Sequence, residues 1–227
     1  MRKAIAKSST RDTAHNNGRA ALIEATIVKM SKDGPALVQP NELCIELGLS
    51  KSLVNFHFGG RDGLIAEALT ISYERYVEGL IAAPDTAGSD PIDRILAWAD
   101  RQIDWTIENP GIACALNFFK QGSSIHTELA PELRARMTAA GEANLRNMFQ
   151  LVIDARRKLH GDDYVDDPMF ASHTASTIGW LTMGEAVWLG GRHVPSNESD
   201  EVAFLFPLAR EFVKGAVVSL LERKPEV

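Results

Sequence analysis

The sequence predicts an all-α protein of about nine helices, arranged as a three-helix N-terminal unit and a larger helical C-terminal unit. Apolar residues recur at spacings of three and four along most of the chain. Gly, Pro and Asn clusters interrupt this pattern at intervals. No stretch alternates apolar and polar residues as a strand would. The chain has 227 residues, 45% of them hydrophobic, so it is long enough to bury a sizeable core.

The N-terminal unit begins with a helix whose apolar face carries Ala20, Ile23, Ile27 and Met30, and Asp33-Gly34-Pro35 ends it. Two short helices follow within residues 37 to 58, joined by a tight turn at Gly48. Four-residue spacings place Leu43 with Leu47 on the first short helix and Val54 with Phe58 on the second. One apolar seam therefore locks the pair, and the polar residues of the second helix face outward.

The C-terminal unit is predicted from longer apolar periodicities. A helix from Leu64 to Leu80 leads into it, and residues 83 to 91 form a turn and linker. Asn109-Pro110-Gly111 is expected to stop the next helix. Helices are expected at residues 92–107, 115–120, 128–159, 168–189 and 201–222. Residues 168–189 are apolar or small nearly all round, so this helix must be covered on several sides.

Charge is distributed unevenly along the chain. Residues 1 to 76 carry ten Lys and Arg against eight Asp and Glu, net +2, whereas residues 77 to 227 carry fourteen against twenty-two, net −8. These values sum to the net charge of −6. Residues 1–15 form a basic, polar arm that we expect to be disordered in isolation. Such an arm can follow a phosphate backbone or a minor groove, or it can remain a solvated terminus.

The residue pattern argues against several functional classes. Cys44 and Cys114 lie far apart without a Cys-His cluster, so neither a metal knuckle nor a disulfide framework is expected. The six histidines are scattered, and no Gly-rich phosphate loop or nucleophile elbow is present. We therefore expect no cofactor, no metal and no enzymatic activity. No apolar run has the length of a membrane span, so a soluble cytoplasmic protein is expected.

The stretch GLSKSLVNFHFGGRDGL resembles the core signature of the TetR family of transcriptional regulators. The residues that keep its register are Gly48, Ser50, His57, Phe58, Arg61, Asp62 and Leu64. The resemblance covers about residues 16 to 76. It implies a helix-turn-helix DNA-binding domain over 16–76 and an effector-binding and dimerisation domain over 77–227. The chain departs from the family pattern at Gln39-Pro40, where Thr is usual, and at Asn55, where a phosphate-contacting Tyr is usual.

DNA contacts are expected mainly from the helix at residues 50–57. Lys51 can donate to guanine or phosphate, Asn55 can pair with adenine, and Leu53 or Phe56 can meet a thymine methyl. Arg61 opens the next helix, where it suits a phosphate. His57 is expected to pack and hydrogen-bond at the helix end, with a phosphate contact as a second role. The full set of candidate DNA-binding residues is Gln39, Asn41, Ser50, Lys51, Ser52, Leu53, Asn55, Phe56, His57 and Arg61.

The resemblance also implies a ligand cavity and a homodimer. The partners would be operator DNA, a second copy bound through helices 168–189 and 201–222, and a small, partly apolar effector. Effector binding would shift the helix that enters the C-terminal unit and release a repressor from paired half-sites; activation is the open alternative. The candidate ligand-binding residues are Trp98, Arg101, Trp105, Asn117, Phe118, Met137, Met148, Phe149, His173, Thr177 and Trp180.

Two other functions are consistent with a helical chain. The run from Asp162 to Asp166 has the DDxxD spacing with which isoprenoid synthases hold magnesium and a diphosphate. Gly161 and Pro168 bracket this run and predict a loop instead of a helix face. A helical adaptor without DNA binding would keep the bundle, but the basic arm and the outward polar residues 50–57 favour the regulator.

Overall fold

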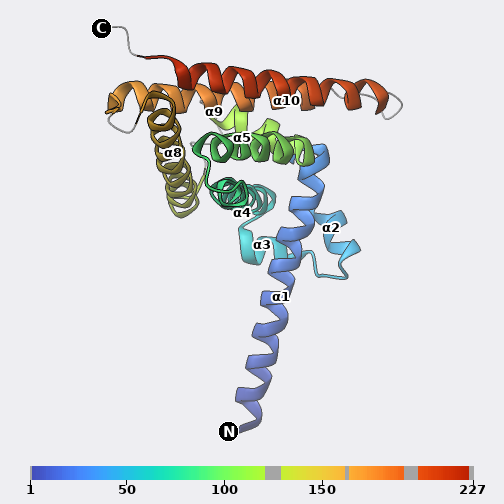
Figure 1. The fold of residues 1–227 in the computed structure, drawn as a ribbon. Helices are drawn as coiled ribbons and strands as arrows, with labels where there is room; N and C mark the ends of the chain where they lie inside the picture. Colours follow the sequence, from blue (N-terminus) through green and yellow to red (C-terminus); the bar gives the residue numbers. More distant parts are fainter. Residues whose placement is uncertain (1, 121–128, 162–163, 192–198, 225–227) are drawn as a thin grey trace. The chain divides into compact units, whose positions relative to one another are not determined.

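The computed structural model describes the backbone of residues 2–120, 129–161, 164–191 and 199–224, and the side chains over most of these ranges. This part of the chain contains nine α-helices, two short 3-10 helices and no strand (Figure 1). The predicted all-α fold is confirmed. The elements are α1 (Arg2–Asp33), η1 (Pro35–Leu37), α2 (Pro40–Glu46), α3 (Ser52–Phe58), α4 (Arg61–Ala82), η2 (Ala83–Thr86), α5 (Pro91–Glu108), α6 (Pro110–Lys120), α8 (Pro131–His160), α9 (Pro168–Gly191) and α10 (Ser199–Glu222).

The chain divides into two compact units. The first contains Met1–Ser72 and Gly111–Arg134, and the second contains Tyr73–Pro110 and Ala135–Val227. The break within α4 lies four residues before the boundary expected from the sequence. The segment that includes α6 joins the first unit, so the chain returns to this unit after α5.

The core of the first unit forms around α1. Leu22 and Met30 are fully buried on this helix, as is Leu64 on α4. Arg19 of α1 pairs with Glu67 of α4, and its guanidinium lies 5.5 Å from the centre of the Phe58 ring. α1 extends back to Arg2 without interruption, so the basic segment expected to be disordered is helical here. No proline occurs before Pro35, and the first glycine is Gly18, so nothing in this segment breaks a helix.

The end of α1 is formed by a close backbone contact with α6. Gly34 has a φ of 78°, and its N–H donates to the Met30 carbonyl at 3.0 Å. A Cβ on Gly111 would lie 2.3 Å from the Met30 carbonyl oxygen and 2.4 Å from the Gly34 nitrogen. Only glycine therefore fits here. The expected stop at residues 109–111 is confirmed, because α5 ends at Glu108 with Asn109 as its C-cap. The expected start of the next helix at residue 115 was wrong, because α6 begins at Pro110, where the missing N–H of proline costs nothing.

The second unit is organised around α5. Asp90 caps this helix by accepting the Ile92 N–H at 2.9 Å, and Pro91 occupies its first position. α5 packs against α9, and α10 packs against both; Figure 1 shows α9 and α10 side by side. Ala171, Ala175 and Ile178 form the buried face of α9, and Val213, Val217 and Leu221 form that of α10.

Candidate nucleic-acid interface and effector region

The turn between α2 and α3 is closed by its own backbone. Gly48 adopts a φ of 64°, a conformation that favours glycine. The Leu49 N–H donates to the Cys44 carbonyl at 2.8 Å, and the Leu47 N–H donates to the Leu43 carbonyl at 3.0 Å. These bonds satisfy carbonyl groups at the end of α2 and fix where α3 begins.

An apolar seam supports the helix-turn-helix from behind. Leu43 and Val54 are each 5% exposed, as the predicted seam requires. Leu47 is 38% exposed, so its predicted place in this seam was wrong. Leu53 and Leu49 are half-buried instead, and a methyl of each lies 3.5 Å from where a Cβ of Gly18 would be. α2 ends at Glu46 and the chain turns there, so Leu47 does not keep the helical spacing that would place it beside Leu43.

Polar side chains and one aromatic ring cover the outward side of α2 and α3. Phe56 is 74% exposed, although it is a large apolar residue. Leu53, the other candidate for a thymine methyl, faces α1 and is half-buried. The exposed members of the predicted DNA-binding set are Gln39, Asn41, Ser50, Lys51, Ser52, Asn55 and Phe56. The structure therefore brings seven of the ten predicted residues to the surface of two adjacent short elements.

The start of α3 leaves hydroxyl groups at the surface. The helix begins at Ser52, two residues later than expected, and Lys51 is the residue before it. The Ser50 Oγ lies 2.8 Å from the Ser52 Oγ and accepts the Ser52 N–H over a long 3.4 Å. Both serines are exposed. Their hydroxyls and the Lys51 ammonium are groups that commonly contact phosphate.

Arg61 has a structural role that sequence reasoning missed. Its Nε donates to the Val38 carbonyl at 3.0 Å, and its Nη2 donates to the carbonyls of Pro35 (2.8 Å) and Ala36 (3.0 Å). The guanidinium thereby ties the start of α4 to the connection between α1 and α2. Nothing in the sequence distinguishes an arginine that binds carbonyls from one that binds phosphate, so no signal was available.

His57 is half-buried between two aromatic neighbours. Its ring centre lies 4.8 Å from that of Phe56 and 5.9 Å from that of Phe58, and both contacts are edge-on. This placement agrees with the expected packing role at the end of α3.

Two of the aromatic residues predicted to bind a ligand, Trp98 and Trp105, lie in the interior of the second unit. Trp98 is 1% exposed, and its Nε1 donates to the Asn144 Oδ1 at 3.1 Å. Trp105 is buried and its ring contacts that of Tyr76 at a tilt of 37°, with ring centres 4.3 Å apart. Burial raises the pKa of the Tyr76 hydroxyl, and the neighbouring Tyr73 raises it further. These rings form an apolar interior that contains polar groups.

The other predicted ligand residues are dispersed. Met148 is buried, and Met137, Phe149 and Arg101 are half-buried. Arg101 donates through its Nη1 to Glu108 at 3.3 Å. By contrast, His173, Thr177 and Trp180 are exposed on the outward face of α9. The side chains of Asn117 and Phe118 lie outside the described residues. The structure thus does not gather this set at one place.

Two amides that bind polar groups in this interior were not predicted, the half-buried Asn144 and the buried Gln102. Asn144 accepts from Trp98, and Gln102 is 1% exposed and donates from its Nε2 to the Gly179 carbonyl at 3.1 Å. Gln102 interrupts the apolar face of α5 beside Ile103, a detectable sequence signal. A buried amide on an apolar face must find a partner, and here it joins α5 to α9.

A separate cavity of about 440 Å³ opens between the start of α5 and the last turns of α8. Ion pairs neutralise much of its charge, because Arg94 pairs with Asp85 at 2.8 Å and Lys158 pairs with Asp90. Hydrogen bonding by Lys158 and by the Ile92 N–H lowers the pKa of Asp90. None of the predicted ligand residues lines this cavity, whose walls are Ser89, Pro91, Arg94, Leu151, Asp154, Arg157 and Lys158.

The DDxxD-like run does not form a metal site in the described residues. Asp166 pairs through its Oδ2 with the Nε of Arg156 at 2.5 Å. Asp162 and Asp163 lie outside the described residues. Within the described part of the chain, no group of three or more His, Cys, Asp or Glu side chains is arranged to hold a metal ion. The observed role of Asp166 is that of a partner for a buried arginine.

Comparisons with known proteins define the class of fold. No protein-family model matches the chain, and no curated protein matches it. Solved structures do match over most of its length. A TetR-family regulator from Streptomyces coelicolor is 19% identical, covers 93% of this chain and 91% of its own, and has a TM-score of 0.60. The TetR-family regulator PfmR from Thermus thermophilus is 18% identical, covers 91% and 99%, and has a TM-score of 0.58.

A third match is the fatty acid degradation regulator FadR from Bacillus halodurans, 10% identical over 88% of this chain and 95% of its own, with a TM-score of 0.61. At these identities the comparisons establish the fold. The chain has the fold of the TetR-family transcriptional regulators, as the resemblance in residues 16–76 predicted. In the described part of the chain, no helix has the length and apolar character needed to cross a membrane.

Proposed function

We propose that this protein is a ligand-responsive transcriptional regulator that binds a palindromic DNA operator as a homodimer. The observation that carries the proposal is the outward side of α3 and of the two residues before it, where the chain is supported from behind by an apolar seam. The exposed residues there are Ser50, Lys51, Ser52, Asn55 and Phe56. A short helix of this kind can lie in a major groove and present side chains to base edges. The shared fold with TetR-family regulators supports the proposal.

Each outward residue has a distinct role in the proposed interface. Lys51 donates to guanine or to phosphate, and Asn55 reads adenine through paired hydrogen bonds. Phe56 meets a thymine methyl, since Leu53 is turned toward α1. Gln39 and Asn41, at the start of α2, contact the phosphate backbone together with Ser50 and Ser52. Arg61 stabilises the first unit, because it joins the start of α4 to three carbonyls between α1 and α2.

A second copy of the chain is the proposed partner of α9 and α10. Both helices expose large apolar side chains opposite their buried faces: Trp180 (74%), Met169 (70%), Leu208 (59%) and Phe212 (59%). Large apolar side chains exposed in this way are typical of an interface. Two copies related by a two-fold axis can read two half-sites, which supplies the affinity that a single short helix lacks.

The proposed effector is a small, partly apolar molecule that binds in the second unit, near the interior around Trp98 and Trp105. Aromatic walls with a few polar groups, such as the amides of Asn144 and Gln102, are typical of such a site. α4 belongs to both compact units, so a displacement of its C-terminal half reaches the helix-turn-helix along one continuous helix. We propose that this displacement releases a repressor from DNA.

The first test is selection of bound fragments from genomic DNA, followed by affinity measurements on the selected site. Lys51→Ala should alter the preferred sequence and weaken binding by about tenfold to a hundredfold, the range of one good base contact. Lys224→Ala removes the same charge from an exposed position in the second unit and should leave binding unchanged. Failure to enrich any fragment, or identical sequence preference in Lys51→Ala, would contradict the proposal.

A further inference from the structure

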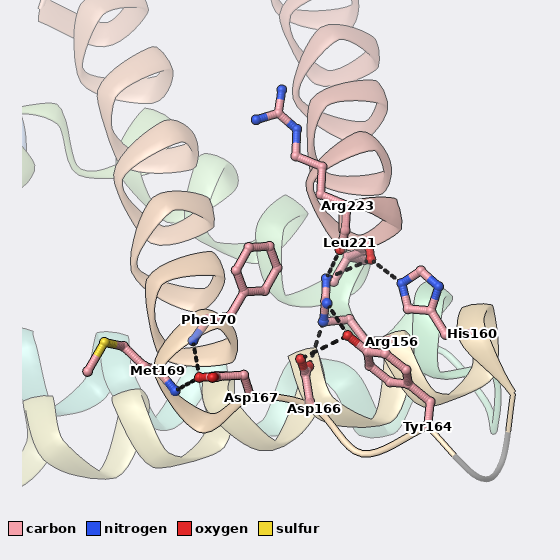
Figure 2. Close-up of polar contacts among 9 residues, drawn as sticks. All are labelled: Arg156, His160, Tyr164, Asp166, Asp167, Met169, Phe170, Leu221 and Arg223. Atoms are coloured by element: carbon pink, nitrogen blue, oxygen red, sulfur yellow. Dashed lines mark hydrogen bonds and ion pairs between the residues drawn. The ribbon is translucent and has the colours of Figure 1, made fainter. Parts of the chain in front are cut away.

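A fully buried arginine near the end of α8 joins three separate segments (Figure 2). The Arg156 Nε donates to Asp166, and its Nη2 donates to the Tyr164 hydroxyl at 2.7 Å, in the loop that precedes α9. Its Nη1 donates to the carbonyls of Leu221 (3.0 Å) and Arg223 (2.6 Å), at the end of α10. One side chain on α8 therefore fixes both the entry to α9 and the end of α10.

The chemistry of these partners explains why an arginine occupies this position. The last carbonyl groups of a helix have no partner within the helix, and a cation near them is favoured by the helix dipole. α10 ends at Glu222, so Leu221 and Arg223 supply such carbonyls. A planar guanidinium can reach these carbonyls and a carboxylate at once, whereas a lysine ammonium cannot present the same fork.

The entry to α9 is fixed by two adjacent carboxylates. Asp166 pairs with Arg156, and its Oδ1 accepts the Tyr164 hydroxyl at 3.2 Å. Asp167 instead caps α9, because its Oδ1 accepts the N–H groups of Met169 (2.8 Å) and Phe170 (3.1 Å). The Phe170 ring lies 4.7 Å from the Arg156 guanidinium carbon. Figure 2 shows Arg156, Tyr164 and Asp166 meeting beside the end of α10, with Asp167 at the first turn of α9.

We infer that Arg156 is a positioning residue for the binding of a second copy, because it holds α9 and α10 in the relative placement that forms their outward apolar face. Met169 on that face follows Asp167 closely, and Phe212 precedes the buried Val213 and Val217 that lead to Leu221. A shift at either helix end would move these side chains out of register with those of the partner. The inference rests on the proposed dimer. It names Arg156, a buried residue that does not itself belong to the apolar face, as a residue on which the affinity of that dimer depends.

The test compares Arg156→Met with Arg157→Met. The two substitutions remove the same charge from neighbouring positions of α8, but Arg157 is exposed. In Arg156→Met, amide hydrogen exchange should accelerate in the last turns of α10 and the first turn of α9, while α5 stays protected. The dimer dissociation constant, measured by sedimentation over a concentration series, should rise by about tenfold or more. Arg157→Met should match the wild type in both measurements.

Each other outcome has a defined meaning. A folded Arg156→Met with wild-type exchange at both helix ends and a wild-type dissociation constant would overturn the inference. Uniform loss of protection, α5 included, would identify an ordinary core residue and would also overturn it. If Arg156→Met does not fold, Tyr164→Phe removes one partner and keeps the ion pair; wild-type values in that variant would equally overturn the inference. A wild-type chain that stays monomeric would instead defeat the proposed dimer itself.

Discussion

Two arginines, Arg61 and Arg156, direct their side chains to backbone carbonyls at the ends of helices or in connections between them. Their role was not visible in the sequence, because carbonyl partners leave no residue-type signature. Asn55 and Phe56 were predicted as outward residues and are exposed, since helical periodicity around the buried Val54 determines their direction. Lys51 was also predicted as outward and is exposed, but it precedes the first residue of α3, so this periodicity does not account for it. Periodicity therefore predicted the direction of Asn55 and Phe56, but not the contact of Leu53 with α1 or the polar atom that each arginine meets.

Arg61→Met should destabilise the first unit by about 2 kcal/mol, the scale of losing hydrogen bonds from a charged donor at a partly exposed position. Three carbonyls of the connection between α1 and α2 lose their donor in this variant. Arg61→Lys should recover only part of the loss, because an ammonium cannot span the three oxygens. Urea unfolding measures both variants. An Arg61 that acts mainly on phosphate would give the opposite pattern: wild-type stability in both variants, with DNA binding restored by lysine.

At the scale of elements, the sequence located the helices well and their ends less well. The expected helices at 168–189 and 201–222 correspond to α9 (Pro168–Gly191) and α10 (Ser199–Glu222). α6 begins five residues earlier than expected, because a proline can open a helix as readily as it ends one. The return of α6 to the first unit could not be predicted. It depends on the contact of Gly111 with Gly34 at the end of α1, and these two residues are 77 positions apart in the sequence.

Gly111→Ala should therefore be among the most damaging single-methyl substitutions in the chain. The added Cβ would lie 2.3 Å from a backbone oxygen and 2.4 Å from a backbone nitrogen, neither of which can rotate away. We expect a loss of about 3 kcal/mol, at the upper end for overpacking. Gly179→Ala is the matched control, because no atom lies within 4 Å of its added Cβ. A helical alanine there should be neutral or stabilising by up to about 1 kcal/mol. Thermal unfolding measures the stability of both variants. Equal unfolding midpoints would contradict the prediction and would show that α6 can shift away from the end of α1 at little cost.

At the scale of the whole molecule, the charge distribution and the apolar face of α9 and α10 belong to one proposed function. The net charge of −6 is the sum of +2 for residues 1–76 and −8 for residues 77–227. DNA attracts the former and repels the latter, which favours approach by the helix-turn-helix. The sequence predicted this division of charge. It also predicted α9 and α10 as the helices of the dimer interface, which stays a prediction. The effector-binding residues were harder to predict, because the core and a ligand pocket use the same aromatic residue types.

Leu208→Glu tests the connection between dimerisation and DNA binding. Leu208 is 59% exposed in the single chain, so a glutamate there should be tolerated by the fold, yet it would place two carboxylates in the proposed dimer interface. We expect the dimer dissociation constant to rise by about a hundredfold or more, the effect of burying an unpaired charge.

Operator affinity should then fall toward the non-specific range, a dissociation constant of roughly 10⁻⁴ to 10⁻⁶ M at physiological salt. Its salt dependence should become shallower, because one half-site makes fewer phosphate contacts than two. Leu145→Glu makes the same change at a residue of α8 that is 51% exposed, and it should leave both constants unaltered. If Leu208→Glu remained dimeric and kept wild-type operator affinity, α10 would not contribute to the interface, and the two half-sites would have to be joined through another surface.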